Sequence, residues 1–407
     1  MIKLPYNRPW LIEISDHPKC PKNIRLSCQK ILTFLWLNRI LPFQFQAPYK
    51  LASNVLERII NEIEYEQNEE EENTYDDDDQ ITINGDDNNN NSNSNTDIDR
   101  NNIQQDPIKI IDFCSGAGGP IDKIEKKINK NRKLNSLSPI QFLLSDLHPP
   151  LNIWKRLYGS PSSSSSSSTT SNKTISYIPH SVDATNTNLQ DSFSNNILNQ
   201  KHLRTFFLSF HHFNEELARS VLVDSMRNSD GICIFELQQC NLRSMFMIAM
   251  LGPLTWLITP FTRPSILTLF FTYIIPIIPL VLIIDGWISC YRTRSISHIL
   301  RLTNLACLTL QLENQDKYFN SNSDNNLDHN SKEHNDDSGD QDQNQDEVEN
   351  HQQQPQQIDY EWKWEFGKVK HTWPFGYMIY IIGRKKRIYY NDESEDDYSV
   401  TTDGVGL

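Results

Sequence analysis

The chain has 407 residues and a formal net charge of −14, but neither number describes its folded part. Three tracts, 62–100, 313–359 and 391–407, hold 34 of the 52 acidic residues and 3 of the 38 basic residues, so the remainder carries a net charge of +17. The tracts have too few apolar residues to form a core, which excludes the two or three globular domains that the length alone would suggest.

Low-complexity sequence divides the chain into one structured domain and several insertions. Residues 62–105, 160–173 and 313–357 are rich in Asn, Ser, Gln and acidic residues, and 391–407 form an acidic tail. We expect these tracts to be disordered, because they bury too little surface to offset the ordering entropy. A stable core tolerates such insertions, since the cost of closing a loop grows slowly with its length.

The cysteines and the first residues indicate an intracellular protein. The seven cysteines include no Cys-x-x-Cys pair and no Cys/His cluster with metal-ligand spacing, which predicts free thiols and no metal site. The opening sequence MIKLPYNRPW lacks the apolar segment of a secretory signal. The basic body is compatible with an anionic membrane surface, a nucleic acid or an anionic ligand, or with a merely solvated surface balanced by the acidic tails.

Short apolar runs alternate with helical patterns through the middle of the chain. Residues 1–61 form a helical N-terminal segment, with helices expected near 24–40 and 52–63. Further helices are expected at 121–130 and 214–227. Strands are expected at 108–113, 140–146, 174–185, 203–213 and 231–238. This alternation predicts an α/β fold whose parallel sheet is covered on both faces.

The C-terminal part predicts two antiparallel strands. Residues 360–369 alternate aromatic and charged side chains, which is the period-two pattern of a half-exposed strand. The apolar run 377–383 follows a Pro-Phe-Gly turn. We therefore expect a hairpin within 358–390 at the edge of the sheet.

Acidic residues end three of the predicted strands, and a glycine loop follows the first. The stretch IIDFCSGAGGP places Asp112 at a strand end, with Gly116, Gly118 and Gly119 in the loop before a helix. Glycines let the backbone approach a ligand closely. Asp146 ends the second strand and Asp183 follows the third. Ligands of open α/β sheets bind at this edge, where carboxylates can accept hydrogen bonds from a ribose or a base amine.

This ordered set resembles the class I S-adenosylmethionine-dependent methyltransferases over about 106–238 and 358–385. The resemblance implies a Rossmann-like seven-stranded sheet with a terminal antiparallel hairpin, and S-adenosyl-L-methionine as cofactor. The residues implied to bind it are Asp112, Cys114, Gly116, Gly118, Asp146 and Asp183. Cys114 stands where the family pattern has its first glycine. A nicotinamide dinucleotide site is disfavoured, because the third glycine of its fingerprint would fall at Ile121.

An apolar insertion, 244–290, interrupts the predicted methyltransferase core between 106–243 and a core helix at 291–312. Its two uncharged runs, 245–262 and 264–284, are separated by Arg263, and each approaches the length that spans a bilayer. We expect membrane association through 245–284, by spanning or by shallow insertion. A soluble lid or substrate pocket is the alternative. The catalytic domain would lie in the cytosol in either case.

The acceptor is expected at the ends of the fourth and fifth strands, where the family binds it. His211, His212 and Glu236 are the candidate catalytic residues there, and Asp285, Tyr291 and Arg292 are candidates to return to the site from the insertion. The insertion favours a lipophilic small-molecule acceptor over nucleic acid, for which we find no binding module. The alternative function is a catalytically inactive, membrane-associated scaffold. The sequence does not indicate an oligomeric state.

Overall fold

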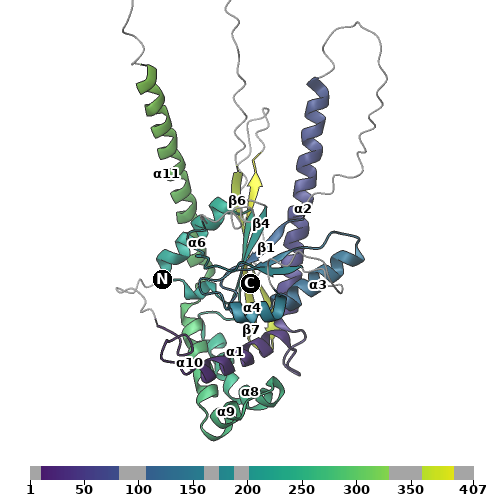
Figure 1. Cartoon of the computed structure of the whole chain (residues 1–407), viewed down its shortest axis with the longest axis vertical. Coiled ribbons are helices and arrows are strands. Elements are labelled where there is room, and N and C mark those ends of the chain that lie inside the picture. The colour runs from purple at the N-terminus through teal and green to yellow at the C-terminus, as the bar shows by residue number, and fades with distance from the viewer. Residues whose placement is uncertain (1–10, 82–106, 160–173, 188–200, 330–359, 389–407) are drawn as a thin grey trace, which may run out of the picture.

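The computed structural model describes residues 11–81, 107–159, 174–187, 201–329 and 360–388. They form one seven-stranded sheet between two layers of helices, with a further group of helices at one end (Figure 1). The predicted disordered tracts lie mainly outside these ranges: 82–105, 160–173, 330–357 and 391–407.

The strand order is β3-β2-β1-β4-β5-β7-β6. The first five strands pair in parallel, and β7 runs antiparallel to both β5 and β6. The strands are β1 (Lys109–Asp112), β2 (Phe142–Leu144), β3 (Ile175–Tyr177), β4 (His202–Phe207), β5 (Gly231–Glu236), β6 (Tyr360–Thr372) and β7 (Gly376–Arg387). This confirms the predicted Rossmann-like seven-stranded sheet and its terminal antiparallel hairpin.

Helices from the first part of the chain cover one face of the sheet. Their apolar residues pack on side chains such as Ile110, Phe142 and Phe235 to form one continuous core. The helices are α2 (Pro48–Ile81), α3 (Ile121–Leu134) and α4 (Leu151–Tyr158). In α3, Ile121, Ile124 and Ile128 share one side of the helix and are fully buried, which the helical spacing predicts.

The opposite face is covered by α6 (Glu215–Asn228) and α11 (Ile296–His329). The predicted N-cap is confirmed, since the side chain of Asn214 accepts a hydrogen bond from the amide of Leu217. Strand residues of alternate parity point to this face, among them Ile111, Phe206 and Ile234. Both faces of the central strands are therefore buried, as a parallel sheet requires.

The apolar insertion forms a separate helical group beside the carboxyl ends of the strands. It packs on α1 (Lys22–Leu37) through a third apolar cluster. Its elements are α7 (Leu242–Ala249), α8 (Leu251–Ile258), η2 (Thr259–Thr262), α9 (Ile266–Leu269), η3 (Phe270–Ile274) and α10 (Ile277–Arg292). Figure 1 shows α8 and α9 at the end of the molecule opposite to the far ends of α2 and α11.

Several predicted boundaries differ from the structure. The third strand, expected over 174–185, ends at Tyr177. The fourth strand, expected over 203–213, ends at Phe207, and a short 3-10 helix, η1 (Phe210–His212), follows it. Helix α2 continues into the tract 62–105 because glutamate favours helices and because Arg384 pairs with Glu62 and Glu66. Helix α11 likewise continues beyond residue 312 to His329.

Candidate functional site

The glycine loop lies between β1 and α3 at the carboxyl edge of the sheet. Four of its residues have positive φ: Cys114 (57°), Gly116 (50°), Gly118 (101°) and Gly119 (44°). A Cβ at Gly116 or Gly119 would meet no atom within 4 Å, so the loop leaves open space at both positions. The backbone conformation favours glycine at these positions, and the exposed Gly116 and Gly119 are available to a ligand, whereas Gly118 is buried.

Asp112 is buried at the base of this loop. Its Oδ1 accepts a hydrogen bond from the Thr205 hydroxyl of β4 at 3.1 Å. Burial raises the pKa of Asp112 to about 7, against hydrogen bonds from Ser115 and Thr205 that lower it. The side chain supports the loop from inside, and its exposure of 3% leaves little of it to a ligand.

Asp146 connects the second strand to the glycine loop. One carboxylate oxygen accepts from the amide of Gly116 and the other from the amide of His148, both at 2.8 Å. A carboxylate has about four acceptor positions, so this half-buried side chain keeps capacity for two hydroxyl donors. The Trp154 indole donates to the carbonyl of Gly116 at 3.0 Å and fixes the loop from the other side.

Asp183 lies on the adjacent loop after β3. A hydrogen bond from the amide of Val182 to the carbonyl of Asp146 joins this loop to the loop after β2. Oδ1 of the exposed Asp183 accepts from the amide and hydroxyl of Thr185 at 2.8 and 2.7 Å. Its other oxygen, Oδ2, has no hydrogen-bond partner among the described residues.

The structure brings all three predicted carboxylates close to Cys114. Burial raises the pKa of the Cys114 thiol, and the charges of Asp146, Asp112 and Asp183 raise it further. Among the described residues, no Lys, Arg or His forms an ion pair with any of these three acids. These carboxylates can accept hydrogen bonds from hydroxyls and amines and can attract a cationic ligand. They would repel the negative charge of a diphosphate.

The second half of the site lies at the ends of β4 and β5. The backbone leaves β4 through Leu208, whose φ is 52°, and η1 then places His211 over the end of β5. His211 Nδ1 lies 2.8 Å from Glu236 Oε2, and the His211 amide donates to Glu236 Oε1 at 3.1 Å. Both side chains are buried.

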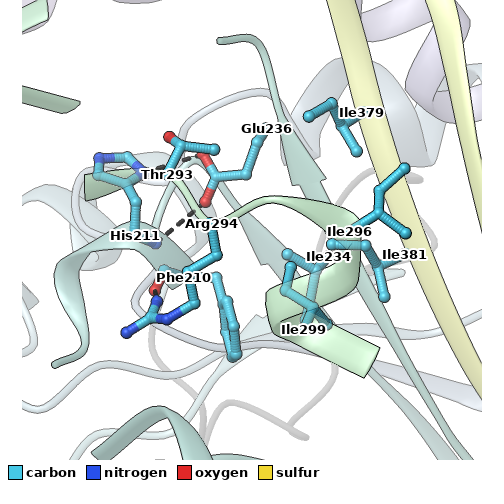
Figure 2. Close-up of a pocket in the computed structure, with 10 residues that line it drawn as sticks. All are labelled: Phe210, His211, Ile234, Glu236, Thr293, Arg294, Ile296, Ile299, Ile379 and Ile381. Atoms are coloured by element: carbon cyan, nitrogen blue, oxygen red, sulfur yellow. Dashed lines mark hydrogen bonds and ion pairs between the residues drawn. The ribbon is translucent and has the colours of Figure 1, made fainter. Parts of the chain in front are cut away.

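Figure 2 shows the His211 ring and the Glu236 carboxylate facing each other, with isoleucines of β5, β7 and α11 across the pocket. The cavity holds about 10 Å³, the space of roughly one water molecule. An organic acceptor does not fit there. We call η1 and the end of β5 the rim. The buried His211–Glu236 pair leaves no space beneath it for an acceptor, so an acceptor would have to lie on the side of His212.

The N-terminal segment completes this rim with two acids that the sequence did not indicate. Glu13 Oε1 accepts from the hydroxyl of Ser289 at 2.7 Å and lies 3.3 Å from Arg292 Nη1. Asp16 Oδ2 lies 3.3 Å from His212 Nδ1. The local sequence around 11–20 contains no strand-end position or repeat, so only the tertiary fold reveals these acids.

Two of the three residues predicted to return from the insertion reach this segment. Arg292 Nη2 lies 3.4 Å from His212 Nδ1 and donates to the His212 carbonyl at 3.3 Å. Asp285 accepts from the amides of Ile14 and Ser15 at 2.6 and 3.0 Å. Asp285 and Arg292 do not form an ion pair with each other, and each holds a different part of the N-terminal segment.

The two adjacent histidines have opposite protonation states. Burial alone would lower the pKa of His211, but the carboxylates of Glu236 and Glu13 raise it to about 9. Burial and the neighbouring His211 charge lower the pKa of His212 to about 3. At neutral pH the rim therefore presents a buried imidazolium and, beside it, a neutral and partly exposed imidazole.

Glu13, His211 and His212 could together supply three ligand atoms to a metal ion, all within 4.8 Å of one another. Their observed partners do not fit a cation. The guanidinium of Arg292 lies against Glu13, and His211 is protonated between two carboxylates. A bound metal would have to displace both positive charges.

No family model and no curated protein matches this chain. Three solved structures illustrate what it is similar to. LepI in complex with SAM is 11% identical over 68% of this chain and 43% of LepI, with a TM-score of 0.32. The plantazolicin methyltransferase BpumL in complex with a triazolic desmethylPZN analogue and SAH is 12% identical over 69% of this chain and 78% of that chain, with a TM-score of 0.31.

The third, PKMT2 from Rickettsia typhi in complex with AdoHcy, is 11% identical over 48% of this chain and 35% of that chain, with a TM-score of 0.21. The chain thus spans less than half the length of LepI. Similarity at these scores carries no argument about activity. The fold assignment depends on the strand order and pairing described above.

Proposed function

We propose that this protein is an S-adenosylmethionine-dependent methyltransferase. The observation that carries the proposal is the convergence of Asp112, Asp146 and Asp183 on one glycine loop without a compensating cation among the described residues. The sheet order supports it, since the first three strands bring these acids to one edge. A scaffold has no physical need for three converging carboxylates.

Each of the three acids would have a different role in binding the cofactor. Asp146 would accept both ribose hydroxyls, because one of its oxygens already bonds the glycine loop and both oxygens retain acceptor capacity. Asp183 would accept from the exocyclic amine of adenine through Oδ2, the oxygen that does not bond Thr185. Asp112 would support the loop that carries Cys114, Gly116 and Gly118 close to the bound molecule.

When bound, S-adenosylmethionine supplies a methyl group activated by a sulfonium centre. The remaining task of the protein is to align the acceptor for in-line attack. His212 is the rim group suited to this task, because its imidazole is neutral and no described residue hydrogen-bonds to its Nε2. Its low pKa makes it an orienting hydrogen-bond acceptor more than a strong base. His211 and Glu236 would hold η1 and so position His212.

The finer proposal concerns the acceptor, which we infer to be a lipophilic small molecule. The elements beside the rim are α7 and α10, which contain no charged residue within 245–249 and 277–284. An acceptor approaching His212 would therefore pass apolar surface. Nucleic acid is less well suited, because the exposed surface of these helices offers few cations for phosphates.

Titration calorimetry of S-adenosylmethionine into the full chain tests the cofactor assignment. Asp146→Asn keeps the size of the side chain and removes its charge, so binding should weaken by about tenfold or more. Glu361→Gln, on the exposed face of β6, is the matched control and should bind as the unchanged protein does. Absence of binding by folded protein would favour the inactive scaffold.

Transfer itself is tested with a labelled methyl donor and a lipid extract, followed by solvent partition. Label in the organic phase is expected for a lipophilic acceptor. His212→Gln should lower the rate without changing cofactor affinity. Label confined to RNA or protein added in parallel would overturn the acceptor class and leave the cofactor assignment standing.

A further inference from the structure

The apolar head, which we define as residues 242–287, buries one apolar cluster against α1, around Ile278 and Leu282, and exposes most of its remaining large apolar side chains. Its interior contains threonine: Thr255, Thr259 and Thr272 are 1%, 0% and 0% exposed. Its outer surface contains large apolar residues, including Leu257 at 69% and Ile266 at 86% exposure. Fifteen of the 37 exposed large apolar side chains among the described residues lie in this head. A water-facing helical unit normally has the opposite distribution.

Several polar side chains of the head hydrogen-bond within it. The hydroxyls of Thr259 and Thr272 donate to backbone carbonyls four residues earlier, at 2.6 and 2.7 Å. The Trp256 indole donates to the carbonyl of Thr272 at 2.9 Å, and the Tyr273 hydroxyl donates to the carbonyl of Trp256 at 2.5 Å. Helical backbone with hydroxyls turned inward is the arrangement that a hydrocarbon environment requires.

The head does not have the form of a spanning hairpin. The segment Leu242–Thr262 is long and apolar enough to cross a bilayer, but the return path bends by 77° between Ile266–Ile274 and Ile277–Arg292. Near the middle of the insertion, Thr268 hydrogen-bonds Ser27 of α1 at 2.9 Å. Because α1 carries the exposed Lys22 and Lys30, this part of the head cannot lie on the far side of a membrane.

Two further segments extend the apolar surface at the same edge of the sheet. The turn between β6 and β7 exposes Trp373 and Phe375, and the loop before α2 exposes Phe43 and Phe45. They are joined to each other by the hydrogen bond from the Trp373 amide to the Phe43 carbonyl at 2.7 Å. Phe375 also contacts Phe246 of α7, with ring centroids 6.5 Å apart.

Basic residues lie around this surface. Arg243 lies over the Phe375 ring at 5.8 Å, and the exposed Lys368 and Lys370 lie beside Tyr377 on the neighbouring strand. Amphipathic aromatic residues next to cations match the boundary between acyl chains and lipid headgroups. The register places this border level with the end of β5, since Lys368 and Glu236 both lie opposite Ile379.

We propose that the apolar head is a re-entrant membrane anchor that inserts into one leaflet of an anionic bilayer. Residues 41–45 and 373–375 complete the lipid-facing surface. What the anchor implies about the methyl acceptor rests on the proposed methyltransferase function. It places the rim with His212 at the membrane, so the acceptor class is a molecule dissolved in that leaflet. Membrane binding itself requires no cofactor.

Flotation of the full chain with phosphatidylcholine vesicles containing phosphatidylserine tests the anchor. The unchanged protein should float, and Leu257→Glu/Ile266→Glu should reduce the bound fraction by about tenfold or more. Leu134→Glu is the matched control, because Leu134 is 74% exposed at the end of α3, which runs from the carboxyl edge toward the opposite edge. The control should float unchanged.

Cofactor calorimetry on the same variants separates the two proposals. Cofactor binding without flotation would overturn the anchor alone, and flotation without cofactor binding would overturn the methyltransferase alone. Unchanged flotation of the double variant would also overturn the anchor. A lipid-free dimer that the double variant disrupts, in a protein that does not float, would assign the surface to a second copy of the chain.

Fluorescence quenching by brominated lipids tests the depth of insertion. Trp256 lies on the head, and the difference between the unchanged protein and Trp256→Phe isolates its signal. Stronger quenching by bromine in the outer part of the acyl chain is expected for a one-leaflet anchor. Equal access to lipids of both leaflets in reconstituted vesicles would refute it in favour of a spanning arrangement.

Discussion

Raising the pH from 6.5 to 9.5 should destabilise this protein through His211. The pKa of His211 is raised from 6.5 to about 9 in the folded chain, by Glu236 first and then by Glu13, against the effect of burial. Below pH 6.5 the imidazole is protonated in both states and its full stabilisation is present. That stabilisation is lost as the pH rises through about 9. At 1.36 kcal/mol for each pH unit, the loss is about 3 kcal/mol.

Urea unfolding at several pH values between 6.5 and 9.5, with reductant present, measures this loss. Glu236→Gln removes the largest cause of the raised pKa and keeps the size of the side chain, so its free energy of unfolding should change much less over the window. Subtracting the two profiles removes the other titrating groups, including the free cysteines. Parallel profiles in the two proteins would refute the assignment of a buried imidazolium.

Substitutions at three further positions test the local structure that supports the site. Asp224→Asn should cost about 3–5 kcal/mol in urea unfolding, because it leaves Arg204 charged and unpaired in the core, where the pair is 0% and 3% exposed. Gly119→Ala should lower stability by about 1–2 kcal/mol through backbone strain alone, and Gly119→Asn should cost less, since asparagine tolerates positive φ. Asn214→Ala should cost about 1 kcal/mol, measured by thermal unfolding, because the cap on Leu217 is lost.

The sheet could be predicted because its signals are local. The runs at 108–113 and 231–238 are apolar and short, and both became fully or nearly buried strands. The Asp112 loop could be predicted for the same reason, since its glycines coincide with positions of positive φ. Whether the three acids bind a cofactor stays a prediction, but their convergence follows from the parallel pairing of β1, β2 and β3.

The rim could not be predicted to the same depth. The apolar residues of 203–213 continue past the true end of β4, so no periodicity marks the change to η1 after Phe207. Glu13 and Asp16 reach the histidines across about 200 residues of sequence, and their role depends on Asp285 holding the backbone of Ile14 and Ser15. Ionic contacts at such separation leave no pattern in a single sequence.

The role of the apolar insertion could not be predicted from its composition alone. Its apolar runs were equally compatible with a buried lid and with membrane contact, because both need similar residues. Side-chain burial supports the proposed membrane contact: a lid would bury Leu257 and Ile266, which are exposed, whereas Thr255 and Thr259 are buried.

Helix α10 links the proposed anchor to the proposed acceptor site. Its first half carries apolar residues such as Leu280, which is exposed, and its second half carries Asp285, Ser289 and Arg292, which bind the N-terminal segment and η1. Because one continuous helix carries both the apolar residues and these contacts, a shift of its apolar half on membrane binding would also move its contacts to Glu13 and His212. Vesicles should therefore change the rate of methyl transfer in the unchanged protein, whereas Ser289→Ala, which removes one contact to Glu13, should reduce that change while flotation is retained. Retention of the full effect in Ser289→Ala would show that the anchor only concentrates the acceptor.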